Sequence, residues 1–117
     1  CTGIGAWRRN PESRWNLTPD LLEDVLKRQH DILRTAAHLI KPDGQLIYAT
    51  CSILKRENEE QIEKFLAEHS DFTIKPIPEI WHTALKSGCP FDGNFMNLRP
   101  DLHRTDGFFC AVLERKK

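Results

Sequence analysis

The amino-acid sequence predicts an α/β fold, and three patterns support this prediction. Apolar residues recur at helical spacing over residues 19–40. A short and almost continuously apolar segment follows at 45–50, after a Pro-Asp-Gly turn, which is typical of a buried strand. A long helix that leads into a buried strand is half of a βαβ unit, so we expect the first strand of that unit to lie upstream of Cys1.

Composition places the chain among globular proteins. It has 117 residues, enough for one domain, and 39% of them are hydrophobic and 29% charged. The 17 basic and 17 acidic residues cancel, which argues against a polyanion binder that relies on bulk charge but leaves room for a local basic patch. We see no apolar run long enough for a membrane span and no signal peptide, and we expect a cytoplasmic protein. The single methionine is Met96, so we interpret the chain as a piece of a longer protein.

The four cysteines favour neither a metal site nor a disulfide scaffold. They are Cys1, Cys51, Cys89 and Cys110. None of them belongs to a Cys-x-x-Cys pair, and none lies three to five residues from a histidine, so the sequence predicts no zinc site. Four cysteines are too sparse for a disulfide framework in a chain of this length, and we expect free thiols in a reducing compartment.

Residues 1–18 form an irregular segment rich in arginine and tryptophan. Two tryptophans bracket three arginines there: Trp7, Arg8, Arg9, Arg14 and Trp15. Cations suit phosphates and aromatic rings suit stacking on bases, so this segment is a candidate RNA contact. The simpler interpretation is a solvated loop whose tryptophans pack on the following helix.

The first helix has clear signals at both ends. Thr18 is a suitable cap, and Pro19 suits the first helical position. The apolar stripe of this helix is interrupted by one polar residue, Gln29. The turn at 41–44 ends the helix and leads into the strand at 45–50.

The rest of the chain predicts one more helix and two more strands. A helix over 57–68 begins with several glutamates, which suit the positive end of the helix dipole. Residues 71–77 predict an edge strand, because Pro76 would break a central strand. Residues 85–106 are rich in glycine and proline and predict a long loop, and 107–114 predict the last strand.

Cys1 and Cys51 are expected to lie in one cleft. Cys51 directly follows the strand at 45–50, and Cys1 would directly follow the strand expected upstream. Parallel strands present their carboxyl ends at the same edge of a sheet, which is where α/β proteins bind ligands. A lone cysteine after a buried strand is also a common core residue, so the spacing alone leaves both interpretations open.

Three separated motifs, in order, span nearly the whole chain. They are CTGIG at 1–5 with RRNP at 8–11, YATCS at 48–52 with ENE at 57–59, and TDGFF at 105–109. Together they resemble the signatures of the NOP/Sun family of RNA cytosine-5 methyltransferases, with bacterial Sun-type enzymes of small-subunit ribosomal RNA as the nearest members. The resemblance implies the carboxyl-terminal part of a Rossmann-like methyltransferase sheet, with about three strands and an antiparallel last strand inserted between the other two.

The resemblance also implies roles for the two cysteines. In the family, the cysteine of the Thr-Cys-Ser motif is a nucleophile that adds to cytosine, which gives that role to Cys51. The cysteine of the family's Pro-Cys loop assists release of the adduct, which gives that role to Cys1. The methyl donor would be S-adenosylmethionine, but its Gly-rich loop has no match here. Residues 1–117 would therefore lack the cofactor-binding half and be inactive alone.

Further residues are implied as RNA contacts by the same motifs. They are Arg8, Arg9, Thr50, Ser52, Asp106 and Gly107. The expected partner is ribosomal RNA, and the exposed strand edge left by the absent half would favour self-association. Two other functions stay open at this point. One is an RNA-binding module without catalysis, and the other is a cysteine hydrolase that would need His103 or Asp106 beside Cys51.

Overall fold

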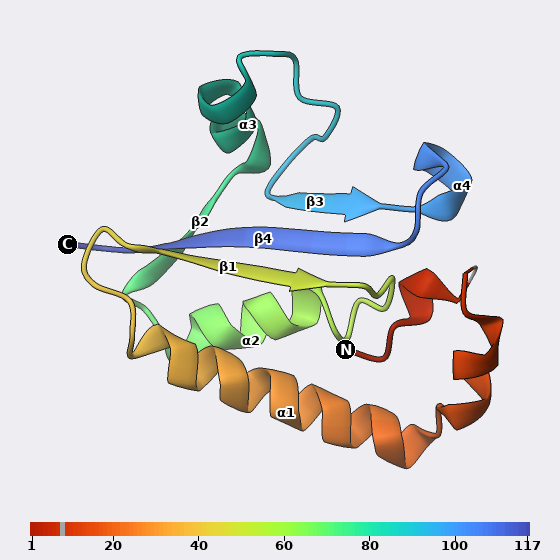
Figure 1. Cartoon of the computed structure of the whole chain (residues 1–117). Helices are drawn as coiled ribbons and strands as arrows, with labels where there is room; N and C mark the ends of the chain where they lie inside the picture. Colours follow the sequence, from red (N-terminus) through yellow and green to blue (C-terminus); the bar gives the residue numbers. More distant parts are fainter. Residues whose placement is uncertain (8) are drawn as a thin grey trace.

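A computed structural model describes residues 1–7 and 9–117 of the chain, and Figure 1 shows its arrangement. Four strands form one sheet, and helices of different lengths surround it. In chain order the elements are η1 (Ile4–Ala6), η2 (Pro11–Asn16), α1 (Pro19–Ala37), β1 (Gln45–Thr50), α2 (Glu59–Glu68), β2 (Phe72–Lys75), α3 (Ile77–Leu85), β3 (Phe95–Leu98), α4 (Pro100–His103) and β4 (Phe108–Arg115).

The last strand, β4, is the centre of the sheet. β1 pairs antiparallel with one edge of β4, from Gln45 opposite Glu114 to Thr50 opposite Phe109. β2 and β3 pair antiparallel with β4 as well, and they follow one another along β4, with β2 opposite residues 112–115 and β3 opposite 108–111. The predicted insertion of the last strand between the other two is confirmed.

The hydrophobic core lies between the sheet and the two longer helices. Alternate residues of β4, namely Phe109, Ala111 and Leu113, are fully buried. They belong to one cluster with Leu33 of α1 and Phe65 of α2. α1 and α2 therefore cover the same face of the sheet, and Figure 1 shows them side by side along it.

The predicted first strand at 45–50 is confirmed with the same bounds, and the predicted first helix is confirmed but ends at Ala37 instead of residue 40. α1 begins at Pro19, and the Thr18 hydroxyl oxygen accepts a hydrogen bond from the Leu21 amide at 3.1 Å, as expected of a cap. α2 begins at Glu59 instead of residue 57. Turns occupy the preceding residues, and the side chain of Glu57 points into the protein, where it is fully buried.

Two predictions for the second half of the chain are wrong in part. The strand predicted at 71–77 is shorter, since β2 spans Phe72–Lys75 and Ile77 begins the helix α3. Pro78 is compatible with this helix because it lies in the first turn, where a missing N–H costs nothing. The predicted loop at 85–106 contains β3 and α4. β3 is only four residues long, and it exists because β4 offers it a partner strand, which local sequence patterns do not reveal.

β1 lies at the outer edge of the sheet within the described part of the chain. It pairs with β4 alone, and its other edge faces away from the sheet. Ile47 on this strand is 64% exposed. None of the described helices is long and apolar enough to cross a membrane.

Candidate active site

Cys1 and Cys51 lie against the same pocket, beside the carboxyl end of β1. Both are free thiols and both are exposed. The pocket has a volume of about 370 Å³ and is lined by Cys1, Gln29, Ile32, Ile47, Tyr48, Ala49, Thr50, Cys51 and Phe108. Four parts of the chain therefore meet at this pocket: the first residues, α1, β1 and β4. In Figure 1 the amino terminus lies near the end of the β1 arrow.

Cys51 is exposed because the residues on both sides of it are anchored inward. Thr50 and Ser52 are buried, whereas Cys51 between them faces out. The Thr50 hydroxyl donates to the side-chain oxygen of Asn58 at 2.5 Å, and the Asn58 amide donates to the Ser52 carbonyl at 2.8 Å. This brace holds the turn after β1 and presents the thiol to the pocket.

A fully buried carboxylate, Glu57, joins three parts of the site. It accepts hydrogen bonds from the Thr2 amide and the Thr2 hydroxyl, each at 2.7 Å, and from the Gln29 side-chain amide at 3.1 Å. The Ser52 hydroxyl is its fourth donor. Several donors are what a buried carboxylate needs, since burying it without them costs a great deal. Glu57 thereby connects the segment of Cys1, helix α1 and the turn of Cys51.

Tyr48 adds a further contact from β1 to the same turn. Its hydroxyl donates to the backbone carbonyl of Glu57 at 2.6 Å. Burial, and secondly the negative charge of Glu57, raise the pKa of Tyr48 well above the usual range. The phenol therefore stays protonated and keeps its role as donor.

Two glycines let the first segment touch the turn of Cys51 and the start of β4. The Gly5 amide donates to the Cys51 carbonyl at 2.9 Å, and the Gly107 amide donates to the Gly5 carbonyl at 2.8 Å. A Cβ on Gly5 would lie 2.2 Å from the Gly107 carbonyl oxygen, closer than any real contact. The close approach of these backbones requires glycine at position 5.

The predicted RNA contacts fall into two groups in the structure. Thr50 and Ser52 already use their hydroxyls inside the protein, and their role as substrate contacts stays a prediction. Arg9 is 73% exposed on its side chain and pairs with Asp106, Nε to Oδ2 at 2.9 Å. Arg8, the other predicted arginine, lies outside the described residues.

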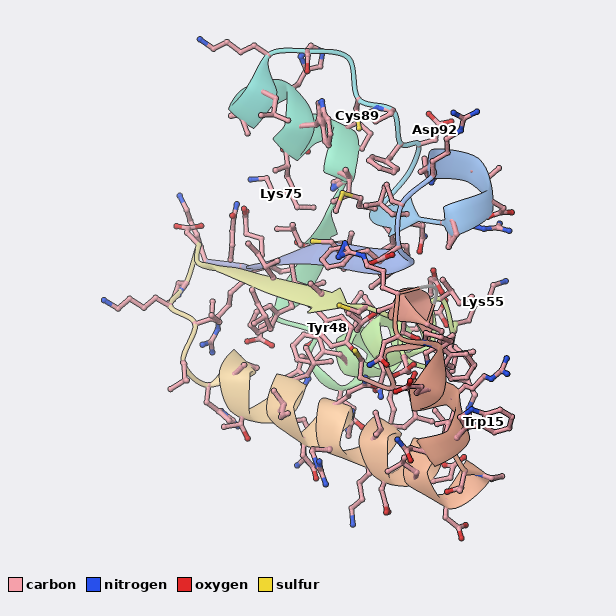
Figure 2. All side chains as sticks on the ribbon, turned by 45° about the vertical axis from the view of Figure 1, so that its right-hand side comes forward. Trp15, Tyr48, Lys55, Lys75, Cys89 and Asp92 are labelled. Carbon is pink, nitrogen blue, oxygen red and sulfur yellow. The ribbon has the colours of Figure 1, made fainter. Side chains whose placement is uncertain are left out.

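Trp15 of the first segment is exposed. Trp15 is 75% exposed, and the Arg14 guanidinium lies over its ring at 4.6 Å from the ring centre. Figure 2 shows Trp15 reaching outward at the side of the molecule. The alternative expectation, that both tryptophans pack on the helix, is wrong for Trp15.

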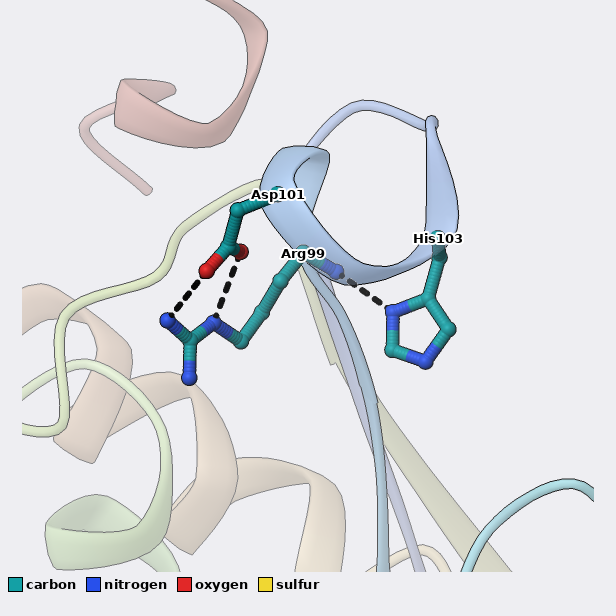
Figure 3. Close-up of polar contacts among 3 residues, drawn as sticks. All are labelled: Arg99, Asp101 and His103. Carbon is teal, nitrogen blue, oxygen red and sulfur yellow. Dashed lines mark hydrogen bonds and ion pairs between the residues drawn. The ribbon is translucent and has the colours of Figure 1, made fainter.

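The cysteine-hydrolase interpretation requires a histidine beside Cys51, and the described residues of the pocket do not provide one. None of the described residues that line the pocket of Cys51 is a histidine. His103, the suggested partner, lies on α4, where its Nδ1 accepts a hydrogen bond from the Arg99 amide at 3.0 Å (Figure 3). Among residues 1–7 and 9–117, no three side chains of the metal-binding types form a group that could hold a metal ion.

Three residues of this site were missed as site residues in the sequence: Thr2, Gln29 and Glu57. Gln29 carried a signal, since it is the one polar residue on the apolar stripe of α1. In the structure it is buried and donates to Glu57. Glu57 belongs to the motif at 57–59, but its place at the start of a predicted helix gave no sign that its side chain turns inward.

Comparison with known proteins identifies the family of this chain. A family model described as 16S rRNA methyltransferase RsmB/F matches residues 1–114. The chain belongs to this family. A probable ribosomal RNA small subunit methyltransferase B from Synechocystis, which is similar to this RsmB/F-family chain, is 36% identical over 115 residues. The family membership confirms the resemblance that the three motifs indicated.

Solved structures confirm the predicted Rossmann-like methyltransferase fold. A crystal structure of PH0851 matches with a TM-score of 0.82 at 39% identity and covers 98% of this chain and 25% of that one. NSun6 from Pyrococcus horikoshii with SFG matches with a TM-score of 0.76 at 23% identity, over 100% of this chain and 28% of that one, and shows the fold alone. The Synechocystis alignment covers 98% of this chain and 25% of the relative, so the chain spans about a quarter of the relatives it matches.

Proposed function

We propose that residues 1–117 are the carboxyl-terminal part of the catalytic domain of an S-adenosylmethionine-dependent 16S rRNA cytosine-5 methyltransferase. The observation that carries the proposal is the pair of exposed thiols, Cys1 and Cys51, on one pocket. RsmB/F family membership and a relative named as a ribosomal RNA small subunit methyltransferase support the RNA substrate. We expect the whole protein to act in the cytoplasm.

Cys51 is the proposed nucleophile. Carbon 5 of cytosine is a poor nucleophile, and addition of the Cys51 thiolate to carbon 6 makes carbon 5 electron-rich enough to accept a methyl group. The new bond joins Sγ to carbon 6, and the methyl group leaves its sulfonium donor with both bonding electrons remaining on the donor sulfur. The braced turn around Cys51 supports this role, because a nucleophile gains from a fixed position.

Cys1 is the proposed group for release. After methyl transfer, carbon 5 must lose its proton, the bond between Sγ and carbon 6 must break, and the ring double bond must form again. The position of this thiol on the same pocket as Cys51 supports a part in that elimination. The exposed position of Cys1 supports this assignment.

The methyl donor is expected to bind chiefly outside these residues. None of the described residues that line the cysteine pocket is an acidic residue or a glycine. This pocket therefore offers no carboxylate that could bind a ribose and no glycine-rich loop. We therefore assign no donor contact to this chain. The free edge of β1 is where we expect the strand of the absent cofactor-binding half to pair.

The test uses the full-length protein with RNA from a ribosomal small subunit. Cys51→Ala should lower methyl transfer to background, because it removes the group that adds to carbon 6. Cys1→Ala should still allow addition and methyl transfer but stall release, so protein and RNA should stay covalently joined in denaturing electrophoresis. Cys89→Ala is the matched control, since Cys89 lies on the segment between α3 and β3 (Figure 2) and should behave as the wild type.

The double variant makes the assignment specific. Replacing Cys1 and Cys51 together should remove the trapped complex, because the adduct forms through Cys51. A Cys51→Ala enzyme that still methylates RNA would reject the nucleophile assignment. RNA binding with no methyl transfer by the wild-type protein, with S-adenosylmethionine present, would favour the RNA-binding module instead.

A further inference from the structure

A second pocket lies beside the turn that carries Cys51. It has a volume of about 450 Å³ and forms between residues 52–59 and residues 97–102, which include the end of β3 and part of α4. Ser52, the residue after Cys51, lines it, and it shares no lining residue with the pocket of the two cysteines. Ser52 and Glu59 belong to the motifs at 48–52 and 57–59, but only Ser52 was given a role there, as an RNA contact, and the pocket as a whole has none.

Glu59 gives the pocket an unused buried acceptor. Its Oε1 accepts a long hydrogen bond of 3.3 Å from the side-chain amide of Asn97. Its Oε2 is buried and has no hydrogen-bond partner in the described part of the chain. A buried carboxylate oxygen without a donor is costly, so a ligand that brings an N–H group to it would gain free energy.

Basic and apolar side chains line the same pocket as this acceptor. Lys55 and Arg99 both line the pocket, and Figure 2 shows the Lys55 side chain extending from the ribbon. Arg99 is held in place by Asp101, with Nε to Oδ1 at 3.1 Å and Nη2 to Oδ2 at 2.8 Å (Figure 3). Leu98 and Leu102 supply apolar lining. Cations, an apolar wall and a buried acceptor together match a nucleotide, which has a phosphate, a flat base face and a polar base edge.

We propose that this pocket, the Glu59 pocket, binds an unpaired guanine of the RNA next to the target cytosine. The proposal rests on the proposed function. An ionised carboxylate only accepts hydrogen bonds. Guanine offers two adjacent donors, N1–H and the N2 amino group. Adenine and cytosine place an acceptor beside their amino group, and uracil has one donor, N3–H, between two carbonyl acceptors. Glu59 therefore distinguishes guanine from the other bases, and Lys55 and Arg99 bind its neighbouring phosphates.

The experiment measures methyl transfer by the full-length enzyme on short RNAs that contain the target cytosine. Each guanine near the target is replaced, one at a time, by inosine, which lacks the N2 amino group. At one position the replacement should raise KM about tenfold, as expected for loss of half of a bidentate base contact, and leave kcat unchanged. Adenine at that position should raise KM further.

The variant Glu59→Gln connects that guanine to the pocket. It keeps the shape of the side chain but replaces one acceptor with a donor, so the KM difference between guanine and inosine should disappear. Glu60→Gln is the matched control, because Glu60 is exposed, follows Glu59 on α2 and does not line this pocket. It should keep the full difference.

Two results would overturn the proposal while the proposed function stands. One is methyl transfer by the wild-type enzyme that is insensitive to inosine at every neighbouring position. That arm needs no variant, so it remains decisive if Glu59→Gln fails to fold. The other is a guanine preference that Glu59→Gln leaves intact, in which case Glu59 serves only the start of α2. Absence of any methyl transfer by the wild-type enzyme would instead reject the proposed function.

Discussion

Thr2 donates two hydrogen bonds of 2.7 Å to Glu57, one from its amide to Oε1 and one from its hydroxyl to Oε2. Thr2 follows Cys1, and the same carboxylate accepts from Ser52, which follows Cys51. One buried side chain therefore fixes the segments of both cysteines relative to each other. Its position also explains why the two thiols share a pocket despite their distance in the chain.

The first prediction concerns this carboxylate. Glu57→Gln should lower the free energy of unfolding by about 1–3 kcal/mol, because the new amide turns one acceptor into a donor that faces other donors. Chemical denaturation of the full-length protein measures the change. Glu63→Gln is the control, because Glu63 is exposed on α2, and it should change the free energy of unfolding by less than about 0.5 kcal/mol.

A measurement of methyl transfer distinguishes a role of Glu57 in positioning the two cysteines from a role in stability alone. Under conditions where the Glu57→Gln protein is folded, its kcat should still fall, since Cys1 and Cys51 are no longer held together. Equal kcat for the variant and the wild type would mean that Glu57 supports the fold alone.

The second prediction concerns Gly5. Gly5→Ala should destabilise the protein by about 2 kcal/mol or more, because the added methyl group meets the Gly107 carbonyl and cannot be accommodated without moving backbone. Gly88→Ala is a matched control, since a Cβ there meets nothing within 4 Å. Thermal unfolding of both variants checks the difference. Similar melting temperatures for the two would show that the contact between Gly5 and Gly107 is loose in solution.

Local patterns in the sequence predict the elements that depend on local interactions. Helical spacing and a cap predicted α1, and an apolar segment after a turn predicted β1. The α3 helix was missed because its local signal is ambiguous, and the β3 strand was missed because its support is not local. Pro78 in the first turn of α3 has the same appearance as a proline that breaks a strand, and β3 depends on pairing with β4.

The candidate site shows the same difference between features with local sequence signals and features that depend on long-range contacts. The motifs and the places after strands predicted that Cys1 and Cys51 share a cleft, and the structure brings them to one pocket. The supporting network was not predictable, because it joins Thr2, Gln29 and Glu57 from three distant segments. A single polar residue on an apolar stripe, as at Gln29, was the available sign that a buried polar partner exists.

The third prediction concerns pH. Tyr48 ionises near pH 10 in the unfolded chain, and burial with the charge of Glu57 raises its folded pKa. The unfolded state therefore loses the phenol proton first, and the stability that this side chain contributes is present below about pH 10 and is lost as pH rises above it. The free energy of unfolding should fall between about pH 9 and about pH 11, and less steeply in Tyr48→Phe.

Urea unfolding of both proteins at the two pH values measures this difference. Lysines titrate in the same range, so the comparison with Tyr48→Phe is needed to isolate the phenol. The tyrosinate absorbance of the native wild-type protein, minus that of Tyr48→Phe, should appear well above the usual pH of tyrosine. If the Tyr48 side chain of the native protein instead showed the usual pKa of tyrosine, its contact with the Glu57 carbonyl would be open to solvent.

The last prediction concerns Arg9 and depends on the proposed RNA substrate. The guanidinium is largely exposed and is oriented by Asp106, so it is available to a phosphate. Arg9→Ala should weaken RNA binding and make the plot of log affinity against log salt shallower by about one, since one phosphate contact and its counterion release are lost. Fluorescence titrations of labelled RNA over a series of salt concentrations measure both quantities.

Two comparisons decide whether Arg9 contacts RNA or only pairs with Asp106. Arg28→Ala removes an exposed arginine from α1 and should leave the salt dependence unchanged, which controls for loss of positive charge in general. Asp106→Asn breaks the ion pair but keeps the cation. An exposed ion pair contributes little to stability, so if pairing were the only role of Arg9, both Arg9→Ala and Asp106→Asn would leave RNA binding unchanged. If Arg9 contacts a phosphate, Arg9→Ala should lower the salt dependence of RNA binding and Asp106→Asn should leave it unchanged.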